Sequence, residues 1–453
     1  MTTSSKTYSI LLFSLVVLLV ACGCEKPQPV DDPGYKMDTT VVEPEDMIWS
    51  GKPCFNLPVE NTASASAMVA IKVRITTDMK QIVYELDDSV QLAGNQKTNL
   101  VISPSEDLAP GFYRANCYVK GKATRNFNFG IDPFDIVSAP DKQADYDQFW
   151  QTAKDQLAAT EMQAVLTEIT DHSSAKRKVY LVEMSSVPDG LNGEPVKIRG
   201  YYCEPTDGAK HPVLVHYYGY DTQGSKAACE CPYGGSSNYA ELYLSHRGQY
   251  LNNRPAGTNP GVEEATENIY GDWFAYNFGD KDGYYYRGAF MDAVQAVRFM
   301  ATRETSDMTK LFAEGSSQGG ALCYAAAGLS DIPFTAITPN VAFMGDFPDY
   351  FQIAGWPAST AKAEAKKKGM TDEQMYAFLS YFDTKNLATR IRCGVLATSG
   401  LKDGTCPPHT NIAPYNNLLT PAENKEYHFY PEMTHDYPKN WYSMIEQFRQ
   451  KFL

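Results

Sequence analysis

The chain has 453 residues, enough for about two or three domains with a large hydrophobic core. Hydrophobic residues make up 43% of it and charged residues 21%, which is ordinary for a globular protein. The formal net charge of −14 argues against nucleic-acid binding, because phosphate backbones are bound by basic patches.

The first 22 residues are predicted to be a targeting segment. Lys6 is the only charged residue there, and residues 10–20 form an apolar core that is too short to span a membrane. Residues 19–22 read Leu-Val-Ala-Cys, which resembles the lipobox of bacterial lipoproteins. The resemblance implies that Cys22 receives a lipid and anchors the protein in the bacterial cell envelope, on the periplasmic side or at the cell surface. An ordinary signal peptide with a chance cysteine is the alternative.

An all-β domain is predicted for residues 47–135, after a flexible linker at residues 23–46. The linker is rich in Pro and Asp and poor in large apolar residues, so it is too polar to fold alone. In residues 67–76 apolar side chains alternate with others, as in a strand with one buried face. Four further short strands are expected at residues 81–86, 99–103, 112–119 and 125–129. Short strands at this spacing predict a small β-sandwich, in which we find no catalytic constellation.

The domain predicted for residues 136–453 has an α/β-hydrolase fold, a mostly parallel sheet flanked by helices. Helical periodicity begins near Asp145, and strands and helices alternate from there. One helix is expected at residues 289–301. Strands are expected at residues 179–184, 196–203, 212–217, 311–313, 394–399 and 426–430, the first two as an antiparallel pair.

Residues 315–319 read Gly-Ser-Ser-Gln-Gly, between an expected strand and a helical stretch of small residues. This G-x-S-x-G pattern is the nucleophile elbow of α/β hydrolases, a sharp turn that presents a serine hydroxyl where a base can reach it. The serine so presented is Ser317. The pattern alone is weak, so residues further along the chain must support it.

Two later residues complete a catalytic constellation. A nucleophilic serine needs a base within hydrogen-bond reach and a third group that orients the base. Asp403 follows the strand at residues 394–399, and His435 follows the strand at residues 426–430. Their order after Ser317 is that of α/β hydrolases, and both lie at C-terminal ends of parallel strands, where sites gather. We predict Ser317 as nucleophile, His435 as general base and then acid, and Asp403 as the orienting carboxylate.

Acyl transfer also needs hydrogen-bond donors for the oxyanion. One donor is predicted to be the backbone N–H of Gln318, the residue after the nucleophile. The second is expected in the loop after the strand at residues 212–217, where we nominate the backbone N–H of Tyr220.

The other histidines and the cysteines are weaker candidates. His409 follows two prolines at a helix start and is expected to cap that helix or lie on the surface, whereas His216 is expected to pack inside a strand. The remaining histidines have no informative context. Cys229 and Cys231 are too close together for a zinc site and lack a second pair. The spacing of the ten cysteines does not fix their disulfide pairing, and neither a metal nor a cofactor is predicted.

The chain from about residue 140 to the C-terminus resembles carbohydrate esterase family seven, the acetyl xylan esterases that include cephalosporin C deacetylases. The motifs that carry the resemblance are the oxyanion loop at residues 218–220, an R-G-Q motif at residues 247–249, a tyrosine-rich stretch at residues 282–292, the S-Q-G-G at residues 317–320, and the acid loop at residues 401–408.

The resemblance implies further roles. Arg247 and Gln249 would support the active-site loops, Arg247 through hydrogen bonds. A homo-oligomer is implied as well, since members of the family assemble as rings of six. Two positions depart from the family pattern: Ser316 stands in place of the usual glycine, and Asp436 in place of the glutamate after the histidine.

The sequence thus predicts a serine carboxylesterase that removes O-acetyl groups from acetylated xylan or oligosaccharides through an acetyl-enzyme. Its expected partners are an acetylated oligosaccharide or another small acetyl ester, and the membrane through the lipid anchor. Two alternatives stay open. One is an esterase or peptidase of the same fold acting on other acyl substrates, because fold does not fix chemistry. The other is a non-catalytic, glycan-binding surface lipoprotein.

Overall fold

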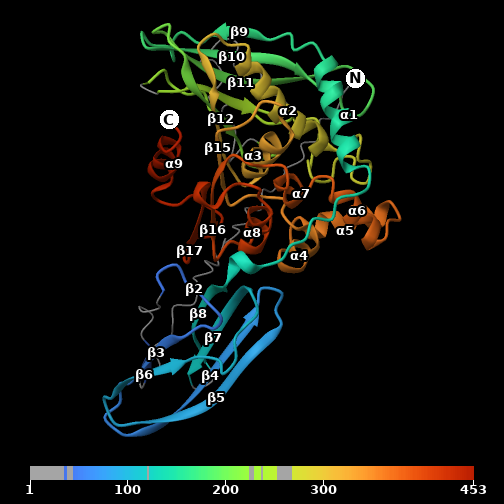
Figure 1. The fold of residues 1–453 in the computed structure, drawn as a ribbon. Helices are drawn as coiled ribbons and strands as arrows, with labels where there is room; N and C mark the ends of the chain where they lie inside the picture. Colours follow the sequence, from blue (N-terminus) through green and yellow to red (C-terminus); the bar gives the residue numbers. More distant parts are fainter. Residues whose placement is uncertain (1–34, 38–43, 120–121, 224–228, 236–237, 252–267) are drawn as a thin grey trace, which may run out of the picture.

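The computed structural model of the chain (Figure 1) describes residues 35–37, 44–119, 122–223, 229–235, 238–251 and 268–453. The predicted signal segment with Cys22 and most of the predicted linker at residues 23–46 lie outside these residues. Within the described part of the chain, no helix is long and apolar enough to cross a membrane.

The N-terminal region contains two β-sheets. One has five strands in the order β2-β8-β7-β4-β5, and the other has three in the order β1-β3-β6. The strands are β1 (Tyr35–Met37), β2 (Ile48–Trp49), β3 (Phe55–Asn61), β4 (Ala67–Thr77), β5 (Ile82–Leu92), β6 (Lys97–Ile102), β7 (Gly111–Val119) and β8 (Lys122–Ile131). The rings of Phe55 on β3 and Phe127 on β8 lie 4.9 Å apart in one hydrophobic cluster. The two sheets therefore pack face to face, as in the predicted sandwich.

Strand β4 shows why the sequence pattern was informative. Val69 and Val73 are fully buried, whereas Met68 is 60% exposed. Successive side chains of a strand point to opposite faces, so this alternation places one face of β4 in the core.

Strand β1 lies within the stretch that was expected to be a flexible linker. It pairs antiparallel with β3, with Tyr35 opposite Asn61. The edge of β3 supplies the backbone partners that this polar stretch lacks on its own.

The C-terminal region is built on a nine-stranded sheet in the order β17-β16-β15-β14-β12-β13-β11-β10-β9. Neighbouring strands from β17 to β13 run parallel, whereas β11, β10 and β9 join antiparallel. The strands are β9 (Val165–Glu168), β10 (Arg177–Ser186), β11 (Val196–Pro205), β12 (His211–Tyr217), β13 (Ala240–Ser245), β14 (Ser306–Ser316), β15 (Ala336–Asn340), β16 (Gly394–Gly400) and β17 (Lys425–Tyr430). The predicted antiparallel pair is β10 and β11.

Helices cover both faces of this sheet (Figure 1). Leu214 and Phe312 pack in one cluster with helix α9 (Trp441–Gln450), whereas their neighbours Val215 and Ala313 belong to the main core. Helices α2 (Tyr285–Ala301) and α3 (Gln318–Leu329) pack into that main core. The predicted α/β-hydrolase architecture is thus confirmed.

The remaining helical segments are α1 (Tyr146–Ala159), α4 (Phe347–Ile353), α5 (Ala358–Lys367), α6 (Asp372–Leu379), α7 (Thr384–Ala388), α8 (Pro408–Asn416) and the short 3-10 turns η1 (Pro133–Asp135) and η2 (Ala422–Asn424). In α1 the buried side chains recur at helical spacing, as the periodicity that begins near Asp145 predicts: Tyr146, Phe149, Trp150, Ala153 and Leu157.

The N-terminal region lies against the β16–β17 edge of the large sheet (Figure 1). The rings of Phe112 on β7 and Phe134 on η1 each lie 6.0 Å from Phe429 on β17. Asn416 at the end of α8 donates to the carbonyl of Pro133 at 3.1 Å. The two regions therefore touch at the end of the sheet that carries the last two strands.

Candidate active site

The nucleophile elbow has the strained backbone that its pattern predicts. Ser317 lies between β14 and α3, with φ of 59° and ψ of −120°. A positive φ at a non-glycine residue is a costly conformation that persists only where the surroundings hold it. A Cβ on Gly319 would lie 2.3 Å from the carbonyl oxygen of Tyr217, and one on Gly315 would lie 2.4 Å from that of Gly319. Only glycine fits at these two positions, so the tight turn requires both.

The structure brings together the three side chains predicted as the triad. His435 Nε2 lies 2.9 Å from Ser317 Oγ, and His435 Nδ1 lies 2.8 Å from Asp403 Oδ2. The Asp403 side chain is fully buried, and its Oδ1 accepts hydrogen bonds from the backbone N–H groups of Thr405 and Cys406 at 2.8 and 2.9 Å. In this geometry the imidazole can take the serine proton while the carboxylate orients the ring.

The two nominated oxyanion donors lie on neighbouring segments. Gln318 is the first residue of α3, where helix geometry leaves the backbone N–H without an intrahelical partner. Tyr220 lies in the loop after β12, the strand next to β14. The close approach of Gly319 to the Tyr217 carbonyl brings that loop against the elbow.

The side chain of Tyr220 is held in place. Its hydroxyl donates to Asp272 Oδ1 at 2.8 Å, and its ring lies edge-on between Trp273 at 5.0 Å and Trp356 at 5.1 Å. Burial and the neighbouring Asp272 carboxylate raise the pKa of the Tyr220 phenol far above its ordinary value. The hydroxyl therefore remains a hydrogen-bond donor, and the loop is fixed next to the elbow.

His246 is a neighbour of the site for which the sequence analysis predicted no role. The buried Gln318 side chain accepts a hydrogen bond from the Tyr286 hydroxyl at 2.8 Å and donates to His246 Nε2 at 2.9 Å. Burial lowers the pKa of His246 to about 4, so the neutral ring can accept this hydrogen bond. The sequence signal that could have indicated a role for His246 is its position directly before Arg247 of the R-G-Q motif.

Arg247 is almost fully buried and saturated with acceptors. Its guanidinium donates to both carboxylate oxygens of Asp292, at 2.9 and 2.8 Å, to Asp189 Oδ1 at 2.7 Å and to the Val187 carbonyl at 3.0 Å. The backbone N–H of Gln249, also fully buried, donates to the His246 carbonyl at 2.9 Å. These contacts fix the segment that carries His246.

His409 corrects one expectation. It was placed on the surface or at a helix cap, yet it is 8% exposed on α8. Its Nδ1 lies 3.4 Å from Asp78 Oδ2 of the N-terminal region, and its Nε2 lies 3.2 Å from Asp349 Oδ2. Burial alone would lower the pKa of His409, but Asp349 and Asp78 outweigh it and raise the pKa to about 10. The ring is therefore a buried cation, covered by a segment that lies far upstream in the chain.

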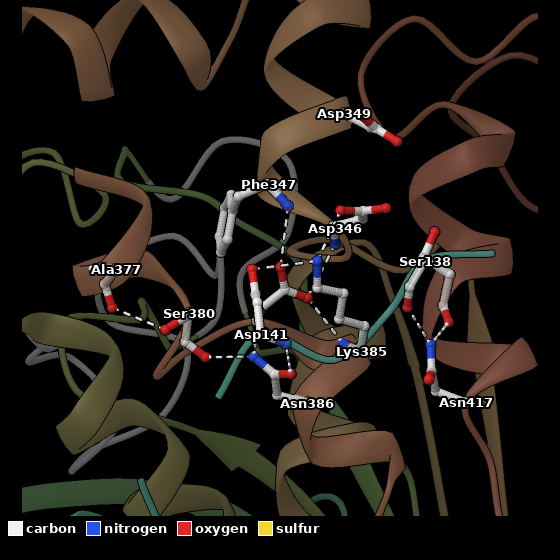
Figure 2. Close-up of polar contacts among 12 residues, drawn as sticks. Ser138, Asp141, Asp346, Phe347, Asp349, Ala377, Ser380, Lys385, Asn386 and Asn417 are labelled. Atoms are coloured by element: carbon white, nitrogen blue, oxygen red, sulfur yellow. Dashed lines mark hydrogen bonds and ion pairs between the residues drawn. The ribbon is translucent and has the colours of Figure 1, made fainter. Parts of the chain in front are cut away.

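Among the described residues, Asp346, Asp349 and His409 are the group whose ligand atoms approach one another closely enough for a metal ion, all within 4.8 Å. Lys385 Nζ donates to Asp346 Oδ1 at 2.9 Å, a pair visible in Figure 2. The ammonium and the charged His409 ring place two cations beside these carboxylates. We assign the group as an ion-pair cluster.

His216 and Asp436 are the two remaining positions that the sequence analysis discussed. His216 packs inside β12 as expected, with its ring stacked on Tyr243 at 3.9 Å. Asp436 accepts a hydrogen bond from the backbone N–H of the next residue, Tyr437, at 2.7 Å, on the turn after His435.

Comparison with known proteins gives consistent matches. A family model described as acetyl xylan esterase (AXE1) matches residues 135–452. The acetyl esterase Axe7A of Xylanibacter ruminicola is 25% identical over 357 residues, which cover 76% of this chain and 77% of that protein. The solved acetyl xylan esterase from Paenibacillus sp. R4 is 28% identical with a TM-score of 0.57, over 71% of this chain and 98% of that one. Acetyl xylan esterase 1 from Thermoanaerobacterium sp. JW/SL YS485, 22% identical, shares the fold with a TM-score of 0.56, over 70% and 97% of the two chains.

Proposed function

We infer the activity of this protein from one premise: the chain belongs to the acetyl xylan esterase family. It is a carboxylic ester hydrolase. We propose that its reaction is the removal of O-acetyl groups from acetylated xylan or from oligosaccharides derived from it.

In the proposed reaction, Ser317 Oγ attacks the acetyl carbonyl carbon while His435 Nε2 takes the hydroxyl proton. The tetrahedral intermediate places its negative charge near the backbone N–H groups of Gln318 and Tyr220. His435 returns the proton to the departing sugar oxygen, which leaves an acetyl group on Ser317. Water, deprotonated by His435, then attacks the acetyl carbon, and acetate leaves as Ser317 is regenerated.

One observation carries this proposal: a continuous chain of two hydrogen bonds from buried Asp403 through His435 to Ser317. The carboxylate can stabilise the imidazolium that forms when His435 accepts the proton. Ser317, Asp403 and His435 follow the ends of three different strands, β14, β16 and β17. The fold therefore assembles the site from separate parts of the chain.

The substrate is tested by incubating the purified protein with acetylated xylo-oligosaccharides and measuring free acetate. The 4-nitrophenyl esters of acetate, butyrate and octanoate provide the comparison. We expect the highest kcat/KM for acetate. A preference for the octanoyl ester, or no release of acetate from the oligosaccharides, would contradict the proposed substrate class without removing the ester-hydrolase assignment.

Removal of the nucleophile is the sharpest test of the proposed chemistry. Ser317→Ala should lower kcat for 4-nitrophenyl acetate by about 10⁴-fold or more, because the residues of a triad act as a unit. Ser316→Ala is the matched control, since the Ser316 hydroxyl accepts a hydrogen bond from Asn340, whereas His435 Nε2 contacts the hydroxyl of Ser317. We expect the control to keep most of its activity. Wild-type turnover by Ser317→Ala would show that another residue is the nucleophile.

A further inference from the structure

We propose that the N-terminal region with strands β1 to β8, the β region, helps to position the active site. Its Asn128 fixes the loop that presents Asp403 to His435. This inference rests on the proposed function, since it concerns how the orienting carboxylate is held. It gives the β region a role beyond that of a spacer.

The direct contact is a hydrogen bond to the start of the acid loop. Asn128 on β8 donates from Nδ2 to the carbonyl oxygen of Leu401 at 2.5 Å. Leu401 is the first residue after β16 and lies two positions before Asp403. The backbone N–H of Leu401 donates to Tyr430 at the end of β17, at 3.0 Å. The peptide groups around Leu401 are thus held between the β region and the strand that precedes His435.

A second contact holds the other end of the loop. His409 lies on the first turn of α8, shortly after Asp403, and faces Asp78 of the β region. The backbone N–H of Asp78 donates to the Phe112 carbonyl at 2.9 Å, which ties Asp78 to β7. The β region therefore contacts the acid loop before and after Asp403.

The surface between these contacts is shaped by both regions. A cavity of about 210 Å³ is lined by Thr77, Phe112 and Asn128 on one side and by Asp403 and Pro408 on the other. The β region and the acid loop, including Asp403, thus line a common cavity.

The connection between the regions is fixed as well (Figure 2). Asn417 on the α8 side donates to the Ser138 carbonyl at 2.8 Å. Asn386 and Asp141 exchange two hydrogen bonds: Asn386 Nδ2 donates to Asp141 Oδ1 at 2.8 Å, and the Asp141 N–H donates to Asn386 Oδ1 at 3.0 Å. The segment that leads from the β region into the C-terminal region with the nine-stranded sheet, the hydrolase region, is hydrogen-bonded to the hydrolase region at Ser138 and Asp141. These contacts favour one fixed placement of Asn128.

Small displacements of a catalytic group have large effects on rate. Asp403 Oδ2 orients His435 over a single 2.8 Å contact. A shift of the acid loop by a fraction of that distance would misalign the imidazole, whereas the substrate-binding groups would stay in place. Loss of the Asn128 hydrogen bond should therefore reduce kcat more than it changes KM.

The test uses Asn128→Ala in the full chain, with Asn126→Ala as matched control. Asn126 lies two residues earlier on the same strand and is exposed. We expect Asn128→Ala to lower kcat for 4-nitrophenyl acetate and the rate constant for fluorophosphonate labelling of Ser317 by about 10-fold to 100-fold, with KM nearly unchanged. The control should match wild type in all three quantities. Thermal unfolding of both variants checks that each is folded.

A double-mutant cycle separates positioning from general destabilisation. If Asn128 acts through the Asp403 carboxylate, Asn128→Ala should have an effect of less than about 2-fold in an Asp403→Asn background. A merely structural role would give the same factor in both backgrounds and would overturn the proposal. So would an Asn128→Ala variant with wild-type kcat and labelling rate. Activity that survives Ser317→Ala would instead overturn the proposed function, so the two failures are distinguishable.

Discussion

Ser316 stands where the family pattern has glycine, and its surroundings explain how a side chain is accommodated. Asn340 Nδ2 on β15 donates to Ser316 Oγ at 2.8 Å and to the carbonyl of Asp436 at 3.2 Å. The Thr398 hydroxyl donates to Asn340 Oδ1 at 2.5 Å and fixes the amide orientation. One side chain therefore joins the elbow to the loop of His435. The additional hydroxyl of Ser316 takes part in this connection.

Arg247 gives a prediction about stability at the residue scale. Arg247→Ala would leave the fully buried Asp292 carboxylate without its guanidinium partner. Breaking a buried pair in this way should lower the free energy of unfolding by about 3–5 kcal/mol. Arg199→Ala is the control, because its pair with Glu183 is partly exposed and should contribute about 0–1 kcal/mol. Urea denaturation measures both, and equal losses would refute the argument.

The residues of the site differ in how far sequence could identify them. Ser317, Asp403 and His435 each follow a predicted strand, so their order along the chain was informative. His246 was missed because its contact with Gln318 depends on the segment after β13 lying beside the start of α3. His409 was misplaced because its partner Asp78 belongs to another region of the chain. No local pattern reports a partner of that kind.

Two of the elements that were predicted well, strand β4 and helix α1, have one buried and one exposed face. In β4 buried and more exposed residues alternate, and in α1 the buried residues recur at helical spacing, as the sequence pattern predicts for both. Strand β15 was missed, because all its residues are buried and Pro339 interrupts the strand signal. Helix α2 begins at Tyr285, four residues before the expected start, since the side chains of its first turn are buried on every side. Periodicity alone gives no signal for an element that has no exposed face.

A charge cluster that joins β12, β13, β14 and α9 gives a prediction at the element scale. His216 Nδ1 lies 2.8 Å from Glu314 Oε1 and its Nε2 lies 3.4 Å from Glu241 Oε1, while Arg449 on α9 donates to Glu314 Oε2. Burial alone would lower the pKa of His216, but Glu314 and Glu241 outweigh it and raise the pKa to about 9. The folded-state pKa thus lies above the unfolded value of about 6.5. The contribution of this pairing to stability is fully present below about pH 6.5 and is lost as the pH rises through about 9.

Urea denaturation at about pH 6 and about pH 9.5 checks this dependence for the wild type and for His216→Gln. We expect the free energy of unfolding of the wild type to fall between the two conditions, and that of the variant to fall less. An equal decline in both proteins would show that His216 is not the group responsible.

At the scale of the whole molecule, the N-terminal segment predicts attachment to a membrane. We expect the full chain, made in a bacterium with lipoprotein-processing enzymes, to sediment with membranes and to be released by detergent. Cys22→Ala should remain unlipidated, which the mass of the N-terminal peptide would report. Its kcat for 4-nitrophenyl acetate should be unchanged, because the proposed site lies in the hydrolase region. A wild-type chain without added lipid mass would refute the prediction.

The division into a β region and a hydrolase region followed from composition and periodicity, but the contact between them did not. The hydrogen bond from Asn128 to Leu401 joins residues 273 positions apart. Each partner has an ordinary local sequence, and only the folded chain brings them together. The sequence therefore indicated the two regions and left the contact between them unseen.

The fixed junction between the two regions has an evolutionary consequence. The part of the chain that matches the family begins at residue 135, after Asp78, Phe112 and Asn128. A gene shortened to that boundary would retain every residue of the proposed triad, yet it would expose Phe429 and leave the Leu401 carbonyl without its donor. If the β region positions the acid loop as proposed, we expect a chain without it to need compensating substitutions in that loop. The part of the chain that matches the family model and the part that would hold the acid loop in the proposed arrangement thus have different boundaries.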